Sequence, residues 1–194
     1  ETSLFSIVGL LMAEFGTLYL AANQAAISFT TLTYTIPWSI SLTATIVIGY
    51  EVGAKNYAVA RQYAVLCQLT ALFIAIGVTL FTYVFVDDIA AIFTTDAETL
   101  LALRSFLLCA VAFAFCDAMG TPVQGILRGY KDVRIITYIA FITYWFISIP
   151  MGYAMAHLTP YGPFGYWLSL IISLAINAAA LNWRLWKQTA WRLS

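Results

Sequence analysis

The hydrophobic positions fall into six long runs, separated by short segments that carry charged residues, glycine and proline. Runs of this kind are typical of helices that cross a membrane, each of which needs about 20 apolar residues. The runs cover residues 1–15, 18–48, 58–86, 99–127, 133–158 and 164–186. We therefore expect an all-α integral membrane protein with six transmembrane helices in one domain that spans residues 1–194.

Three of the runs contain an internal proline, namely Pro37, Pro122 and Pro150. Proline removes a backbone donor, and a membrane helix tolerates this where neighbouring groups satisfy the freed carbonyl. We predict that these three helices are kinked. Two glycine pairs, at 49/53 and 125/129, have the spacing that permits close helix packing, although glycines near helix ends can equally mark the ends themselves.

The first run is short for a membrane span. Its fifteen residues would rise about 22 Å, against about 30 Å for the hydrocarbon core. It is either a half-helix or the remainder of a span that begins upstream. We favour the second interpretation, in which the chain is the later part of a longer protein.

Composition supports the membrane assignment. Hydrophobic residues make up 62% of the chain and charged residues only 9%, whereas soluble domains carry about 25% charged residues. The formal net charge is zero, which argues against a basic surface for nucleic acid.

Basic residues are distributed very unevenly between the two ends of the predicted helices. Alternating spans put eight of the nine Lys and Arg residues on one side and only Arg104 on the other. The positive-inside rule assigns the richer side, with the C-terminus, to the cytoplasm. The eight residues are Lys55, Arg61, Arg128, Lys131, Arg134, Arg184, Lys187 and Arg192.

Asp117 is an ionisable residue that lies within a predicted span and not in a loop. It lies eleven residues before Arg128, about 16 Å from the interface and near the middle of the bilayer. A charge at this depth costs about 2.5–3.5 kcal/mol on insertion scales. It is either a protonated group that bonds between helices or a carboxylate that binds a proton or small cation in a polar cavity. We favour the second role.

Glu1 is a second candidate, because a span that continues upstream would bury it at a similar depth. Glu14 lies near the outer end of the same run, where its side chain reaches water. Two adjacent carboxylates resist simultaneous ionisation and take up a proton, and their oxygens can also coordinate sodium. Asp117 and Glu1 are therefore the predicted coupling pair, with a proton or sodium ion as the coupling ion and no cofactor.

Asn23, Gln24 and Tyr34 lie on the second run, which is rich in hydroxyl and amide side chains. We expect these residues to line a cavity beside Asp117. Such side chains more often form hydrogen bonds between helices, and that alternative stays open.

Several stretches together resemble one transporter family. They occur in the order ETSLFSIVGLLMAEFG, AANQAAISF, YTIPWSIS, VIGYEVGAKN, FTTDAE, GILRGYKDVR and YWFISIP, and span nearly all 194 residues. The chain resembles the C-terminal half of a multidrug and toxic compound extrusion (MATE) transporter of the NorM branch.

The resemblance implies one six-helix lobe of a twelve-helix, two-lobe transporter whose N-terminal lobe is absent from this chain. Such proteins exchange cationic or aromatic drugs for sodium or protons, here in a bacterial inner membrane. Their partners would be lipid, drugs and the missing lobe, with no nucleic acid. The resemblance implies that Glu1 and Asp117 are cation-site carboxylates. Phe113, a cavity residue, would replace a tyrosine of some relatives and remove a cation ligand.

Other functions remain to be weighed. A lipid-linked precursor flippase has the same architecture, but it would need cationic residues at mid-membrane, where this sequence has none. A membrane hydrolase is disfavoured because His157 is the only histidine and no HExxH motif occurs, so we expect a protein that is not an enzyme. In a non-transporting structural subunit, Asp117 would serve only as a hydrogen-bond partner.

Overall fold

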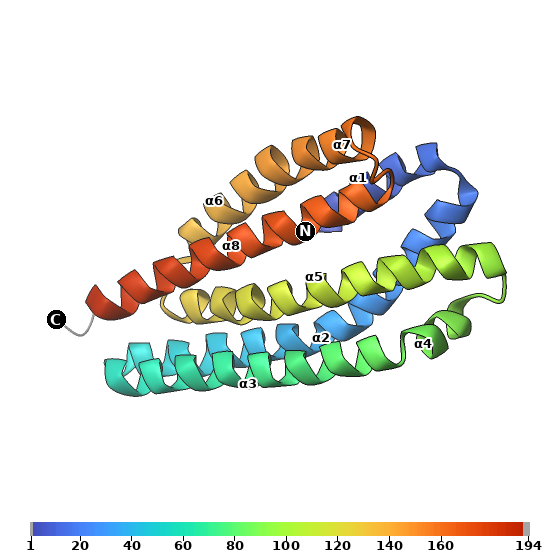
Figure 1. Cartoon of the computed structure of the whole chain (residues 1–194). Helices are drawn as coiled ribbons and strands as arrows, with labels where there is room; N and C mark the ends of the chain where they lie inside the picture. The colour runs from blue at the N-terminus through green and yellow to red at the C-terminus, as the bar shows by residue number, and fades with distance from the viewer. Residues whose placement is uncertain (1, 192–194) are drawn as a thin grey trace.

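The computed structural model describes residues 2–191, with side chains from residue 5 to residue 188, and this range is almost entirely helical (Figure 1). The elements are α1 (Thr2–Met12), η1 (Ala13–Phe15), α2 (Thr17–Gly53), α3 (Tyr57–Val84), α4 (Val86–Phe93), α5 (Ala97–Gly129), α6 (Val133–Phe141), η2 (Ile142–Ser148), α7 (Ile149–Leu158) and α8 (Phe164–Trp191).

The six predicted runs are confirmed as helical segments. Five of them, with α6, η2 and α7 counted together, are long and apolar enough to cross a membrane, and the first is shorter. The second run extends to Gly53, five residues beyond the predicted end, and the fourth continues to Gly129. The first run ends where predicted, because Gly16 has a φ of 99° that side-chain-bearing residues rarely adopt.

Two features of the connections were not predicted. The segment after α3 forms the short helix α4, whose first turn carries Asp87 and Asp88, where negative charge favours a helix. At the next helix start, the hydroxyl and backbone N–H of Thr99 donate to the Asp96 carboxylate and hold its pKa below the usual value. Asp96 therefore stays ionised as the N-cap of α5.

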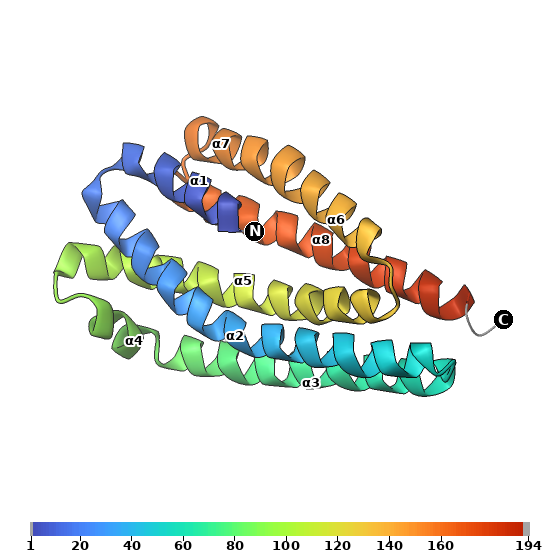
Figure 2. The ribbon, with the colours of Figure 1, turned by 180° about the vertical axis from the view of Figure 1, so that it is seen from behind.

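The three prolines act differently. Pro37 lies inside α2, which changes direction about midway along its length (Figure 2). Pro122 lies inside α5, which continues through it as one helix. The fifth span is interrupted: the π-helix η2 directly precedes α7, in which Pro150 occupies the first turn. A widened turn accommodates the carbonyl that loses its donor to the proline.

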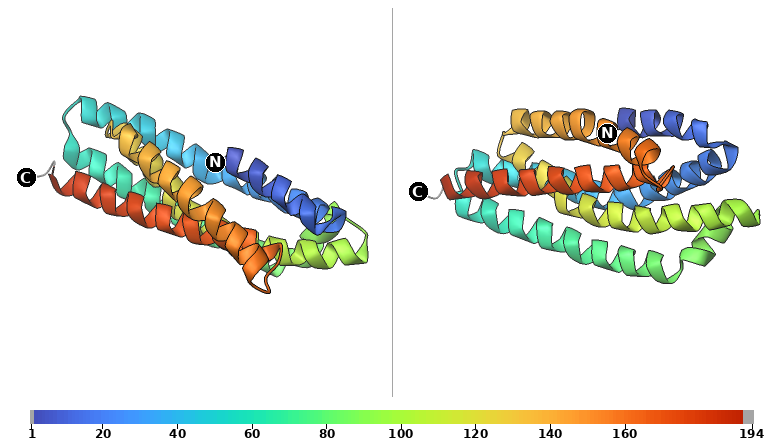
Figure 3. Two further views of the ribbon diagram at one scale, coloured as in Figure 1. Left: turned by 90° about the horizontal axis from the view of Figure 1, so that it is seen from above. Right: turned by 45° about the horizontal axis from the view of Figure 1, so that its top comes forward.

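Helix α5 is the centre of the bundle, since it packs against α2, α3 and α8. The fifth span, formed by α6, η2 and α7, lies along α8 (Figure 3). The α2–α3 and α5–α6 connections and the C-terminal part of α8 share one end of the molecule (Figure 1). The described basic residues, apart from Arg104, therefore gather at that end, as the sequence predicts.

Two matching turns form this basic end. Lys55 and Lys131 have φ values of 62° and 65°, and each follows a helix that ends in glycine. In both turns the next residue donates its backbone N–H to a carbonyl five residues back, from Asn56 to Glu51 and from Asp132 to Leu127. This pattern is a Schellman C-cap. Arg184 Nε, on α8, then donates to Asp132 Oδ2 over 2.7 Å and fixes the second turn to α8.

Helices α2 and α5 cross in close contact because glycine lies at the crossing. A Cβ added to Gly125 would lie 2.1 Å from the backbone oxygen of Ser41, and one on Gly129 would lie 2.9 Å from Ile48 Cβ. Thr45 Oγ1 donates to Gly125 O across the interface over 3.0 Å. Gly53, by contrast, has nothing within 4 Å of an added Cβ. Close packing therefore explains the glycines at 125 and 129 but not Gly53.

Substituting Gly125→Ala is predicted to separate α2 from α5 and to lower stability by about 1–3 kcal/mol, the usual cost of overpacking. The melting temperature of the intact protein that contains this chain would measure the effect. Gly77→Ala on α3 is the matched control, because an added Cβ meets nothing within 4 Å and alanine favours a helix. Equal melting temperatures for the two variants would show that the crossing is not tightly packed.

Candidate functional site

Asp117 lies in the buried middle of α5, with only 3% of its surface exposed. One helical turn further on, Thr121 Oγ1 donates a hydrogen bond to Asp117 Oδ1 over 2.7 Å. Residues four apart share a helix face, so α5 itself supplies a donor to the carboxyl group. Thr121 is also buried. Thr121 was not predicted from the sequence. A threonine four residues after a buried aspartate could have indicated a hydrogen bond to the carboxyl group.

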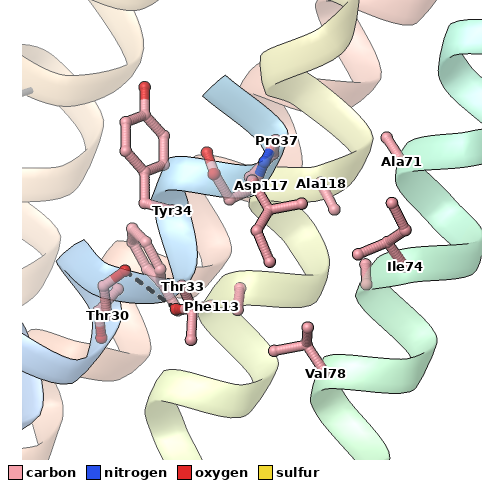
Figure 4. A pocket seen from close by; sticks show the side chains of 13 residues that line it. Thr30, Thr33, Tyr34, Pro37, Ala71, Ile74, Val78, Phe113, Asp117 and Ala118 are labelled. Carbon is pink, nitrogen blue, oxygen red and sulfur yellow. Dashed lines mark hydrogen bonds between the residues drawn. The ribbon is translucent and has the colours of Figure 1, made fainter. Parts of the chain in front are cut away.

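A cavity of about 200 Å³ opens beside Asp117 between α1, α2 and α5. A narrower cleft of about 30 Å³ continues from it towards α3, past Ala71, Ile74 and Val78 (Figure 4). The two share Thr30, Tyr34, Phe113 and Asp117. Drug-sized ligands generally need about 300–1,000 Å³, so the wider cavity provides only part of such a pocket. The other lining residues of the wider cavity are Phe5, Ile27 and Thr31.

Threonines form the polar wall of α2. Thr30 and Thr31 each donate their hydroxyl hydrogen to the carbonyl four residues earlier, over 2.8 and 2.9 Å. Thr33 donates to the carbonyl of Thr30, as the dashed line in Figure 4 marks. The hydroxyl donors are thus satisfied within α2, and the oxygen atoms remain as acceptors along the cavity. These threonines line the cavity and do not bond between helices.

Aromatic rings surround the carboxyl group. Phe113, one turn before Asp117, packs edge-on against Phe5 with ring centroids 5.6 Å apart and against Trp167 at 6.2 Å. Tyr34 lies 5.9 Å from Trp38 on α2, and the Arg128 guanidinium lies 5.7 Å from the Trp38 ring. Tyr34 and Phe113 both line the cavity beside Asp117. Trp38 and Arg128, which continue this wall towards the basic end, were not predicted.

Asn23 has a different role from the one that we expected. It is fully buried, and its Oδ1 accepts a hydrogen bond from Trp167 Nε1 over 2.9 Å. This bond ties α2 to α8, which is the alternative that the sequence left open. Asn23 does not line either of the cavities beside Asp117. The spacing of polar residues on α2 could not reveal this difference, because the partner is 144 residues away.

Gln24 and Glu1 complete the predicted set. Gln24 is exposed and lies outside both cavity walls. Glu1 falls outside the described residues, so the predicted pairing of Glu1 with Asp117 stays a prediction. Among the residues whose side chains the structure describes, no group of three or more His, Cys, Asp or Glu side chains gathers as a metal site would. Phe113, which lacks an oxygen, offers no ligand to a cation.

Glu14 lies at the end of the bundle opposite to the basic turns. Its side chain is 60% exposed, and its Oε2 lies 3.7 Å from His157 Nε2. Tyr166 Oη also lies near His157 Nε2, at 3.5 Å, and the Tyr153 ring packs on the imidazole with centroids 4.4 Å apart. The cluster joins η1 to α7 and α8 and lies apart from Asp117. It agrees with the expectation that Glu14 reaches water.

Comparison with known proteins gives consistent matches in sequence. The MatE family model matches residues 1–154. A probable multidrug resistance protein NorM of Halalkalibacterium halodurans is 44% identical over 185 residues, which is 95% of this chain and 40% of that protein. The corresponding protein of Bacillus subtilis strain 168 is 43% identical over 191 residues, covering 96% of this chain and 41% of its own. The chain therefore spans about two fifths of the length of these relatives.

Solved structures match the fold. The crystal structure of the eukaryotic MATE transporter AtDTX14 superposes with a TM-score of 0.89 at 19% identity, and covers 97% of this chain and 44% of that one. The Vibrio cholerae MATE transporter VcmN in its bent form gives 0.86 at 20% identity, with 98% and 43% covered. The chain covers 44% and 43% of these two transporters, which is the share expected for one of two similar lobes.

Trp167→Phe is predicted to lower stability by about 1–3 kcal/mol, because it leaves the buried Asn23 amide without its donor. Thermal unfolding of the intact protein would measure this loss. Ligand affinity, measured on the same preparation, is expected to stay within about twofold, because the bond lies outside the cavity walls. A variant with unchanged stability but weakened ligand binding would instead assign Asn23 to the cavity.

Proposed function

The chain belongs to the MatE family, and from this premise we propose that it is the C-terminal lobe of a secondary multidrug exporter. The lobe would take up a proton or sodium ion at Asp117 while the whole transporter expels a cationic or aromatic drug. The observation that carries this proposal is an aspartate that is only 3% exposed within an apolar bundle yet lies on the wall of a cavity. Intramembrane ionisable groups in such surroundings generally mark ion or proton pathways.

Alternating access explains why the carboxyl group must change its charge. An ionised Asp117 favours a state in which its cavity reaches water, whereas a neutral one tolerates closure. A ligand shifts such an equilibrium only by its differential affinity for the two states. Uptake of a proton or cation therefore biases the transporter towards one state, and binding of a cationic drug to the ionised carboxylate biases it towards the other.

Of the two coupling ions, the described residues favour the proton. A proton requires one carboxyl oxygen, and the Thr121 hydroxyl can reorient to donate to the charged form or accept from the neutral one. Sodium requires several oxygen ligands, and Phe113 supplies none where the resemblance suggests a tyrosine in some relatives. The threonine oxygens of α2 and the carboxylate of Glu1 are the groups that a sodium site would need.

The energy is adequate for export. A tenfold ion gradient supplies about 1.4 kcal/mol, and each charge that moves through 100 mV adds about 2.3 kcal/mol. One imported cation could therefore sustain a drug gradient of a few hundredfold when the drug moves without net charge.

Placement in the membrane follows from the basic end. We propose that the two lysine turns and the C-terminal part of α8 face the cytoplasm of a bacterial inner membrane, as the positive-inside rule requires. Drugs would then leave towards the Glu14 end. The cavity of about 200 Å³ is smaller than a drug site, so the N-terminal lobe would supply the opposite wall.

The flippase alternative has less support. Phosphate groups require cationic partners, and no Lys, Arg or His lines either cavity beside Asp117 in the described part of the chain. Arg128 lies against the Trp38 ring at the basic end.

Asp117→Asn is predicted to abolish gradient-driven dye efflux from vesicles that contain the intact transporter, because an amide cannot bind the coupling ion. Proton and sodium gradients are imposed separately, and the gradient that drives wild-type efflux identifies the ion. Asp88→Asn is the control and should keep full efflux. Asp88 is an exposed acidic residue on α4, at the end of the bundle opposite to the basic turns. Coupled efflux that survives in Asp117→Asn would reduce the residue to a hydrogen-bond partner, as in a structural subunit.

Tyr34→Leu is predicted to weaken the binding of flat cationic dyes about 2- to 30-fold, since a cation–π contact contributes about 0.5–2 kcal/mol. Fluorescence titration of the intact transporter would measure the dissociation constants. Tyr138→Leu removes a ring that is 65% exposed on α6 and should leave binding unchanged. An equal loss in both variants would argue against a dye site beside Tyr34.

A further inference from the structure

A second recess lies between α3 and α8, away from the Asp117 cavity. Its volume is about 300 Å³, and it opens at the basic end of the bundle. Helices α3 and α8 both pack on α5. The lining residues are Arg61, Ala64, Val65, Gln68 and Leu69 from α3, and Asn182, Leu185 and Trp186 from α8.

Two polar side chains of the recess wall bond to α5. Gln68 Nε2 and Asn182 Nδ2 both donate to the backbone oxygen of Met119, over 3.3 and 3.0 Å. Met119 lies one turn before Pro122, which lacks a backbone donor. Gln68 Oε1 is buried and has no hydrogen-bond partner among the described residues. The two bonds to Met119 fix α3 and α8 on either side of the recess.

The mouth of the recess carries positive charge and an aromatic ring. Arg61 is exposed and forms no ion pair with the side chains that the structure describes. Arg61 also borders a more open groove along α3, of about 550 Å³, which Leu66 and Leu69 line. Trp186 is 68% exposed, and Lys187 Nζ lies 4.0 Å from the ring centre of Trp183 on the same turn of α8.

The depth of these groups matches the layers of a lipid. Arg61 lies in the first two turns of α3, and Trp186 near the end of α8, where interfacial aromatic and basic residues meet headgroups. Val65 and Leu69 continue one and two turns deeper into the bundle, beside the hydrocarbon. Basic recesses between transmembrane helices on the cytoplasmic side bind the headgroups of anionic lipids.

We propose that this recess binds the headgroup of an anionic phospholipid. The lipid phosphate lies at Arg61, the headgroup extends from there towards the aqueous side, and an acyl chain follows Val65 and Leu69. Charge selects the occupant, because the zwitterionic lipid places an ammonium group beside a guanidinium. The site shares no lining residue with the Asp117 cavity.

The test counts lipids bound to the purified full-length transporter by native mass spectrometry, with phosphatidylglycerol and phosphatidylcholine as probes. Wild type should prefer phosphatidylglycerol. Arg61→Gln should weaken phosphatidylglycerol binding about fivefold, the equivalent of about 1 kcal/mol for one interfacial charge. Arg134→Gln is the matched control, because Arg134 is exposed at the same end but lies on α6 outside the recess.

A second variant tests the shape of the site without removing charge. Val65→Trp fills the recess, keeps Arg61 and should cause a similar loss of phosphatidylglycerol binding. Inorganic phosphate at millimolar concentration should not displace the lipid, because it makes no contact along the acyl path. Equal weakening in Arg61→Gln and Arg134→Gln would overturn the proposal in favour of general surface charge. So would a lack of preference for phosphatidylglycerol, or full displacement of the lipid by phosphate.

Discussion

The close crossing of α2 and α5 is the constraint on which the rest of the lobe depends. Gly125 leaves no room for a side chain against the Ser41 backbone, and the Thr45 hydroxyl bonds across the same contact. Water cannot drive this association inside a bilayer, so it relies on small residues and on such hydrogen bonds. Away from the crossing the two helices diverge, because α2, which contains Pro37, changes direction about midway along its length (Figure 2). The Asp117 cavity lies between α1, α2 and α5.

The divergence explains how one bundle holds both a tight core and a cavity. At the crossing, glycine permits backbone contact. About two turns away, Tyr34 and Phe113 keep α2 and α5 apart, and α1 closes the side through Phe5. The Asn23–Trp167 bond fixes the far end of α2 to α8. Rigid contacts at both ends of α2 therefore flank the segment that faces Asp117, and a change in charge there acts on a segment that is held at its two ends.

The sequence was sufficient to predict the helical spans, the basic end and the burial of Asp117, since all three depend on composition along the chain. Asp117 stood out because a charge within an apolar run is expensive. The roles of the polar residues on α2 could not be predicted, because they depend on which face of α2 meets which neighbour. Asn23 and Thr30 are seven residues apart, yet one bonds to Trp167 and the other lines the cavity. The helix α4 was likewise hidden by its short length.

The Asp117 cavity and the recess between α3 and α8 lie on opposite sides of α5, next to the same part of that helix. Asp117 faces the cavity with α2, while the Met119 carbonyl, two residues later, accepts from α3 and α8 in the second recess. Both lie within one turn or so of Pro122, where α5 lacks a backbone hydrogen bond. Because Gln68 and Asn182 tie this weakened turn to their own helices, a change in the turn on ion binding at Asp117 would be transmitted to α3 and α8. A lipid held between those two helices would then resist or favour the change according to which state preserves its recess.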